Sequence, residues 1–243
     1  METDLKSKKY VVIMDLELTC SEPPLPRQDM EIIEIGIEVV DSKTLDTISH
    51  ISTVVKPIKN PILTDYCKDL THISQEEVDN SLNLVDAVKL LFLLDLPQPD
   101  EFVWCSWGND PIWLQKELER AGSDIIFDKR FINLKLIDNT KDKRRGLKKA
   151  LEANNIEQTQ PAHRAWADAM STANLARKYH ISIEDVQVSN TKTYRQKISD
   201  EQKVKIKELS DKCEISLEAS KYILKNMSWD FSKAKHLMSL LDK

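Results

Sequence analysis

The chain has 243 residues, a formal net charge of −5 at pH 7 and a hydrophobic fraction of 41%. This length allows one sizeable core plus a small second unit. The longest apolar run, residues 90–96, is interrupted by Asp95. It is far shorter than the roughly 20 apolar residues that span a bilayer, which excludes a transmembrane protein.

The four cysteines are Cys20, Cys67, Cys105 and Cys213. They form no C-x-x-C pair and no Cys/His cluster, so we expect neither a structural zinc site nor a disulfide framework. Residues 1–9 are charged and lead directly into an apolar run, so we expect no signal peptide. These features predict a soluble, cytoplasmic protein. Net acidity does not exclude a nuclease, because such an enzyme can reach phosphate through metal ions that carboxylates hold.

The first part of the chain predicts three strands in succession. Residues 10–14 are an apolar, β-rich run that stops at Asp15-Leu16-Glu17. Residues 31–40 mix alternation with apolar pairs and predict a second strand, and residues 48–55 predict a third. Three consecutive strands indicate an antiparallel start to the sheet. A loop with two prolines follows.

Beyond this loop, helical and extended patterns alternate. The predicted elements are a helix at 82–94, a strand at 102–107, and helices at 111–121, 147–153 and 167–179. Gly122 stands where a C-cap glycine belongs. Strands followed by alternating strands and helices predict an α/β domain over residues 1–180. Residues 181–198 are polar and weakly patterned, and we expect a linker there.

Asp15 and Glu17 are the strongest local feature. In an extended segment, residues i and i+2 point to the same side, so both carboxylates would converge at the end of a buried strand. This arrangement costs free energy unless a cation compensates the charge. An ordinary strand-end pair that faces solvent is the alternative.

His163 and Asp168 form a second candidate pair, and Asp110 is a third position of interest. Pro161 and Ala162 favour a loop at His163, whereas Asp168 falls in the first turn of the next helix. Asp110 follows a strand and opens a helix. Each feature alone is also typical of a surface histidine or of an acid at a helix N-terminus.

Together, four acids and a histidine suit a two-metal site for phosphodiester cleavage. Such a site holds cations roughly 3.5–4 Å apart against the attacking and leaving oxygens. Four carboxylates neutralise two divalent ions, and oxygen ligands favour Mg²⁺ or Mn²⁺ over zinc. Histidine, with an unperturbed pKa near ~6.5, suits deprotonation of the attacking water.

Three motifs resemble the DEDDh exonucleases of the RNase H-like superfamily, and more closely their Eri-like branch. Residues 15–20, D-L-E-L-T-C, look like the D-F-E-A-T-C of that branch. Residues 66–79 begin Y-C-K-D-L-T-H-I-S-Q and resemble its F-C-x-x-L-T-x-I-x-Q…V-D. Residues 163–169, H-R-A-W-A-D-A, resemble its H-R-A-x-x-D-A. The resemblance covers about residues 8–180.

The resemblance implies an RNase H-like mixed sheet flanked by helices. It also implies a 3′→5′ exonuclease that uses two divalent cations, Mg²⁺ or Mn²⁺, to release nucleoside monophosphates from single-stranded RNA or DNA 3′ ends. The matching positions are the metal-binding acids Asp15, Glu17, Asp110 and Asp168, the general base His163, and the nucleotide contacts Leu18, Thr19, Tyr66 and Leu70.

The sequence departs from the family pattern at two places. Asn109 stands where the family usually has an aromatic residue, and the segment 107–110 is one residue short. We assign Asp110 as the third acid because Leu114 falls four residues later, as the helix of the family requires. Ala167 replaces an acid that is common before the final aspartate, although that acid is not a metal ligand.

The end of the chain has a separate pattern. Three short amphipathic stretches predict helices at roughly 200–212, 216–226 and 231–241. Trp229-Asp230-Phe231, followed by Ala234 and Leu237, resembles ubiquitin-associated-like three-helix domains. The resemblance implies a small all-α domain over residues 199–243 that docks a protein partner. A helical appendage that packs on the nuclease is the alternative.

Other interpretations stay open at this point. The basic cluster, Lys141, Lys143, Arg144, Arg145, Lys148 and Lys149, suits either phosphate tracking or a solvated loop. A nucleic-acid-binding or scaffold protein that reuses the fold would usually have lost an acid or the histidine. A polymerase-associated proofreading exonuclease has no polymerase-binding or clamp-binding motif here to support it. The sequence does not choose RNA over DNA.

Overall fold

The computed structural model describes residues 8–123, 125, 130–138, 146–188 and 200–213, and the single residues 220, 224, 231, 232 and 234. None of the helices in these parts of the chain has the length and apolar content needed to cross a membrane.

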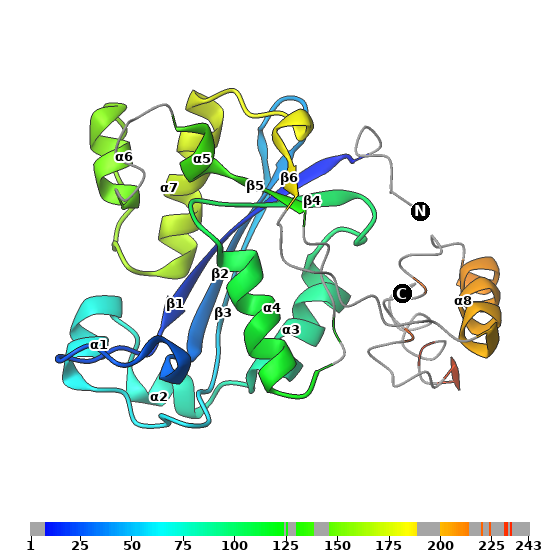
Figure 1. Ribbon diagram of the computed structural model, residues 1–243, viewed down its shortest axis with the longest axis horizontal. Helices are drawn as coiled ribbons and strands as arrows, with labels where there is room; N and C mark the ends of the chain where they lie inside the picture. Colours follow the sequence, from blue (N-terminus) through cyan, green and yellow to red (C-terminus); the bar gives the residue numbers. More distant parts are fainter. Residues whose placement is uncertain are drawn as a thin grey trace.

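A mixed six-stranded sheet forms the centre of the molecule, in the order β3-β2-β1-β4-β5-β6 (Figure 1). β2 is antiparallel to β1 and β3, β4 is parallel to β1 and β5, and β6 is antiparallel to β5. The strands are β1 (Tyr10–Leu18), β2 (Ile32–Asp41), β3 (Thr47–Val54), β4 (Phe102–Ser106), β5 (Arg130–Asn133) and β6 (Gln187–Val188). The predicted antiparallel start is therefore confirmed.

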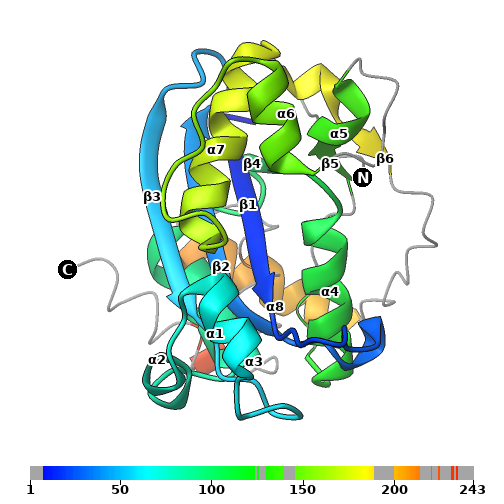
Figure 2. The same ribbon diagram turned by 90° about the vertical axis from the view of Figure 1, so that its left-hand side faces the viewer.

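Helices cover both faces of the sheet (Figures 1 and 2). Alternation along β1 sends Val12 and Met14 into a core with α3 (Leu84–Leu90) and α4 (Asp110–Arg120). The intervening residues, Val11 and Ile13, pack on the other face against α6 (Leu147–Ala153) and α7 (Ala165–Lys178). By the same alternation, Asp15 and Glu17 belong to the face that α7 covers.

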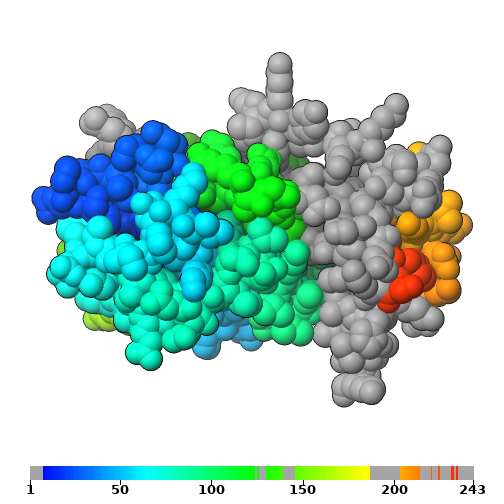
Figure 3. Space-filling view, turned by 90° about the horizontal axis from the view of Figure 1, so that it is seen from below, coloured from blue at the N-terminus to red at the C-terminus, as the bar shows by residue number. Residues whose placement is uncertain are grey.

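Shorter helical segments connect these layers. They are η2 (Arg27–Asp29), α1 (Asp65–Thr71), α2 (Gln75–Asp79), the π-helical η3 (Leu91–Asp95), α5 (Leu134–Ile137) and η4 (Ile183–Asp185). In the view of Figure 3, the blue segment after β1, the cyan segment around α1 and the green helix α4 adjoin on one face. A cation–π contact joins two of these segments, with the Arg27 guanidinium 5.1 Å from the centre of the Trp113 ring.

The structure corrects several predicted boundaries. β1 does not stop at Asp15, because its ladder with β2 continues to Leu18. The helix predicted at 82–94 is α3 followed by the π-helical η3. Gly122 follows α4 with φ of +71°, a conformation that glycine tolerates, so the predicted C-cap is confirmed.

Part of the predicted linker belongs to the sheet domain. Gln187 and Val188 pair with β5, and Ile181 is buried in the core beneath α6 and α7. These residues looked like a linker because their segments are too short for periodicity to be visible. The helix predicted at 200–212 is confirmed as α8 (Asp200–Cys213). The helices predicted at 216–226 and 231–241 lie mostly outside the described residues.

Candidate active site

The acids of β1 lie on a stretch of the strand that is paired on one side. β4 pairs with β1 only from Tyr10 to Ile13. Among the described strands, the later part of β1 pairs with β2 alone, with Asp15 opposite Gly36 and Glu17 opposite Glu34. Both acids are half-buried. Because β4 ends early, no described strand pairs with this edge of β1 beside Asp15 and Glu17.

Gly36 allows α7 to lie directly on β2. A Cβ atom at this position would lie 2.0 Å from the carbonyl carbon of Ala165 and 2.2 Å from the amide nitrogen of Trp166. Only a residue without a side chain fits such a close approach between two main chains. The first turn of α7, which contains Asp168, therefore lies over the sheet next to the acids of β1 (Figure 2).

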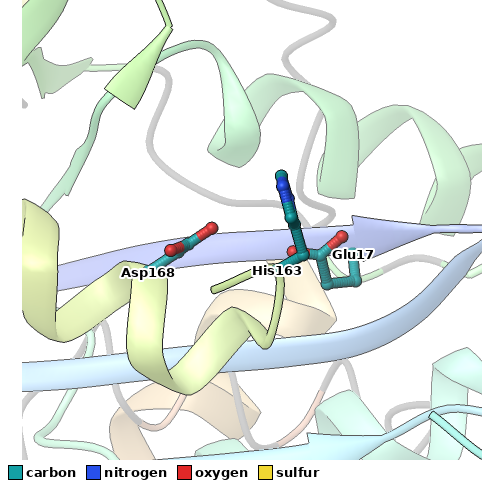
Figure 4. Close-up of side chains that lie close together, drawn as sticks. All are labelled: Glu17, His163 and Asp168. Atoms are coloured by element: carbon teal, nitrogen blue, oxygen red, sulfur yellow. The ribbon is translucent and has the colours of Figure 1, made fainter. Parts of the chain in front are cut away.

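Three side chains from separate segments come together at this place. One ligand atom each from Glu17, His163 and Asp168 lie within 4.8 Å of one another. Glu17 comes from β1, His163 from the loop before α7, and Asp168 from α7 (Figure 4). His163 is exposed and has φ of +62°. The predicted positions on a loop and in a first helical turn are confirmed.

Asp15 and Asp110 lie beside this group rather than within it. Asp110 is the first residue of α4, after the N-cap residue Asn109. Burial raises the pKa of Asp110, and hydrogen bonds from its own backbone N–H and with Ser106 partly offset this. The pKa of Asp15 is raised well above its ordinary value by burial and by the nearby negative charge of Asp110. The two carboxylates are therefore close enough to repel each other.

The remaining acids are also perturbed. Burial, followed by repulsion from Asp168, raises the pKa of Glu17 to about 9. Burial raises the pKa of Asp168, whereas the amide of Gln158, which donates to its Oδ1 at 2.9 Å, lowers it. Four acids with raised pKa values in one place are unfavourable unless a cation balances their charge.

The predicted nucleotide contacts follow β1 or lie on α1. Thr64, the N-cap of α1, donates from its hydroxyl to the Cys20 carbonyl at 2.7 Å, which attaches α1 to the end of β1. Tyr66 is 43% exposed, and Leu70 and Leu18 are half-buried. Thr19 is buried, and its hydroxyl accepts the backbone N–H of Glu31. An exposed aromatic ring thus lies on a helix that is fixed next to the strand carrying Asp15 and Glu17.

Sequence reasoning gave no role to three residues next to the acids, namely Glu34, Gln158 and Arg164, although Arg164 stands in the H-R-A motif. Glu34 is fully buried and paired with Arg164. Alternation in β2 places Glu34 and Gly36 on one face, but that pattern is equally typical of a solvated face. No local signal marks Gln158. In the predicted basic cluster, Lys148 and Lys149 are exposed on α6, and the other members lie outside the described residues.

The mixed sheet, the helices on both faces and the acids beside the central strand define an RNase H-like nuclease fold. The nuclease domain of 3'hExo, a DEDDh family member bound to rAMP, has this fold, with a TM-score of 0.64 at 22% identity. That similarity covers 75% of this chain and 97% of the other. The model of the RNase_T exonuclease family matches residues 12–176, more than half of the sequence. The chain belongs to this exonuclease family.

Two relatives are similar over shorter regions. ERI1 exoribonuclease 3 from Homo sapiens is 30% identical over 134 residues, which cover 52% of this chain and 39% of that protein. The 3'-5' exonuclease eri1 from Schizosaccharomyces pombe is 36% identical over 85 residues, covering 35% and 29% respectively. The chain thus matches less than half the length of these relatives. The predicted relation to Eri-like DEDDh exonucleases is confirmed. The predicted ubiquitin-associated-like domain lies beyond the family match and stays a prediction.

Proposed function

We propose that this chain is a metal-dependent 3′→5′ exonuclease that releases nucleoside monophosphates from single-stranded RNA ends. One observation carries the proposal. Glu17, His163 and Asp168 come from three separate segments and bring their ligand atoms within 4.8 Å of one another. Asp15 and Asp110 lie beside them, and the whole set belongs to a chain of the exonuclease family.

The residues present fit divalent cations. The donors are carboxylate oxygens, which Mg²⁺ and Mn²⁺ prefer. Burial and mutual repulsion raise the pKa values of Asp15 and Glu17, so a cation would relieve an existing electrostatic cost. We infer that Asp15, Glu17, Asp110 and Asp168 hold two such ions. When bound, the ions supply stabilisation of charge on the attacking and leaving oxygens of the phosphodiester.

The other groups of the site position the substrate and move a proton. His163 is exposed next to Glu17 and Asp168, where its ring can accept a proton from the attacking water. Tyr66 offers its exposed ring to a terminal base, with Leu70 and Leu18 as apolar neighbours. Stacking of a base on an aromatic ring contributes roughly 1–3 kcal/mol and tolerates any sequence. Stacking uses the face of the base and does not require it to be unpaired, so the preference for single strands is supported by the family resemblance alone.

RNA is our proposed substrate because the human relative is named an exoribonuclease and the 3'hExo domain was bound to rAMP. Purified protein with Mg²⁺ should shorten a 5′-labelled RNA oligonucleotide one nucleotide at a time. A matched single-stranded DNA and an RNA with a paired 3′ end should be shortened more slowly. Equal rates on RNA and DNA would refute the choice of RNA and leave the nuclease proposal intact.

Asp15→Asn tests the chemistry. This change keeps the size of the side chain and removes its charge, so hydrolysis should fall below detection. Asp86→Asn is the matched control, because Asp86 is exposed on α3, away from the acids. Hydrolysis that survives Asp15→Asn would exclude the metal assignment. Wild-type protein that binds RNA and neither hydrolyses it nor binds Mn²⁺ would favour a binding protein that reuses the fold.

We also propose a docking role for residues 199–243 and a cytoplasmic location. The docking role is supported by the resemblance of 229–237 to ubiquitin-associated-like domains. The location is supported by Cys20, Cys67 and Cys105, which are free thiols, as a reducing compartment favours. Affinity capture from cytosol with the full chain should retain a specific partner, and capture with Trp229→Ala should lose it. Identical captures would refute the docking role, and a tagged chain found outside the cytosol would refute the location.

A further inference from the structure

Two arginine–glutamate pairs join the helix α7 to the strand β2, one near each end of the helix. Near the start, Arg164 contacts Glu34, and near the end, Arg177 contacts Glu38. We call them the site-end pair and the far-end pair. Both glutamates are buried on the α7 face of β2, with Gly36 between them. Only the site-end pair lies next to a candidate catalytic residue.

The site-end pair has many hydrogen bonds. Arg164 Nε donates to both carboxylate oxygens of Glu34 at 3.1 Å, and Nη2 donates to Oε1 at 3.0 Å. The Ala165 backbone N–H donates to Glu34 Oε2 at 2.7 Å. A planar guanidinium with several donors fixes a carboxylate more strictly than an ammonium group does. Glu34 therefore holds both the side chain of Arg164 and the first backbone N–H of α7.

The same guanidinium contacts two further segments. Arg164 Nη1 donates to the His72 carbonyl at 3.3 Å and to Glu77 Oε1 at 3.3 Å. Glu77 belongs to α2, and His72 follows α1. Arg164 thus connects the start of α7 with β2 and with the segment that contains Tyr66. It lies directly after His163 in the sequence.

The backbone of His163 requires such support. Its φ of +62° is a conformation that residues with side chains rarely adopt, and it persists only where the surroundings impose it. Arg164 and Ala165, which follow His163 in the sequence, are fixed by Glu34. Glu34 is also the ladder partner of Glu17. The residue that fixes this loop therefore lies directly opposite a candidate metal ligand.

From these contacts we propose that Arg164, held by Glu34, is a positioning residue for His163. The guanidinium contacts Glu34, Glu77 and the His72 carbonyl, and none of the candidate metal-binding acids is among these partners. It determines where the imidazole lies relative to Glu17 and Asp168, and so how effectively the histidine accepts the proton of the attacking water. The inference rests on the proposed exonuclease function. It adds that catalysis requires a correctly placed His163 as well as the metal-binding acids.

The far-end pair provides a matched control. Arg177 Nη2 lies 3.8 Å from Glu38 Oε1, and Arg177 Nε donates to the Leu45 carbonyl at 2.9 Å. The two pairs share the helix, the strand and the residue types. Their neighbours differ, because the far-end pair lies next to core residues such as Val40 and Leu45. Equal substitutions at the two pairs therefore separate positioning from stability.

The test compares Arg164→Lys and Glu34→Gln with Arg177→Lys and Glu38→Gln. Each rate is divided by the concentration of folded protein, and all four variants should lose thermal stability. At the site end, kcat for RNA hydrolysis should fall on the order of 10²-fold with KM nearly unchanged, as for a catalytic group displaced by ~1 Å. At the far end, kcat should stay at the wild-type value. If Arg164→Lys fails to fold, Glu34→Gln tests the same pair.

A second measurement reports the position of His163 without turnover. Bound Mn²⁺ broadens the NMR signals of nearby imidazoles, and His163→Gln identifies the signal concerned. In the wild type and in Arg177→Lys this signal should broaden strongly, and in Arg164→Lys it should broaden less. Unchanged kcat or unchanged broadening in the site-end variants would overturn the positioning role while the nuclease proposal stands. Wild-type protein without hydrolysis and without Mn²⁺ binding would instead overturn the proposed function itself.

Discussion

The two ends of the contact between α7 and β2 each carry an arginine–glutamate pair, and the two pairs have different neighbours. At the site end, Glu34 and Arg164 lie next to Glu17, Asp168 and the exposed His163. At the far end, the equivalent pair lies next to apolar core residues on β2 and α7. The comparison teaches that the consequence of a buried ion pair depends on its neighbours. We expect the far end to affect stability alone and the site end to affect stability and catalysis together.

The largest effect should come from Gly36→Ala, which disrupts the contact between α7 and β2 at the site end. The new Cβ would overlap the backbone of Ala165 and Trp166, so α7 must move away from β2 or the domain must unfold. Hydrolysis should be lost, and the melting temperature should fall sharply. Gly146→Ala is the matched control, because a Cβ there meets no atom within 4 Å. Full activity in Gly36→Ala would show that the contact does not set the geometry of the site.

A smaller effect is expected from Gln158→Leu, which removes the side-chain amide that donates to Asp168 Oδ1. Residues that orient metal ligands typically change metal affinity or activity by about 10–100-fold. Mn²⁺ affinity, measured by calorimetry, should therefore weaken by about this factor. Gln160→Leu is the control, since Gln160 is exposed and makes no contact with Asp168 in the described structure. Equal affinities in the two variants would show that Gln158 does not orient the ligand.

The pH dependence of stability should report the protonation of Glu17 at the site end. The folded pKa of Glu17 is about 9, against an ordinary value of 4.5. Folding without metal therefore takes up a proton between these values, so this contribution to stability is present below about pH 4.5 and is lost as the pH rises toward 9. In EDTA, Glu17→Gln should melt at a higher temperature than wild type at pH 8, and the difference should shrink at pH 5. A difference independent of pH would contradict the raised pKa.

The smallest effect belongs to the far end. Thr47 on β3 donates its hydroxyl to Glu38 and accepts from Arg177 Nη2. Thr47→Val keeps the shape and removes these hydrogen bonds, each of which contributes about 0.5–1.5 kcal/mol. For a domain of this size, about 1 kcal/mol corresponds to a shift in melting temperature of ~2–4 °C. Calorimetry should show such a decrease, and RNA hydrolysis by the folded protein should not change.

Four of the five candidate residues could be found from the sequence because they stand in short motifs, whereas Asp110 stands alone. Asp15 and Glu17 are two residues apart, and His163 and Asp168 are five apart, so local periodicity predicts a strand, a loop and a first helical turn. The ion pair could not be predicted in this way. Glu34 and Arg164 are 130 positions apart, and their contact depends on how β2 and α7 pack.

The fold shows the same division between local and distant information. The longer strands and helices follow from their hydrophobic patterns. α1 and α2 have seven and five residues, too few for a period, and their N-caps, Thr64 and Ser74, stabilise them. β6 has only two residues and depends on pairing with β5. Short elements of this kind depend on contacts that a local pattern does not contain.

The close approach at Gly36 also bears on how the protein can evolve. The backbones of β2 and α7 are in direct contact there, so position 36 cannot accept a side chain unless α7 moves. Selection for a different substrate can act instead on α1, where the Tyr66 side chain is exposed. A library that randomises positions 36 and 66 together, selected for activity on a different substrate, should return glycine at the first position and varied residues at the second.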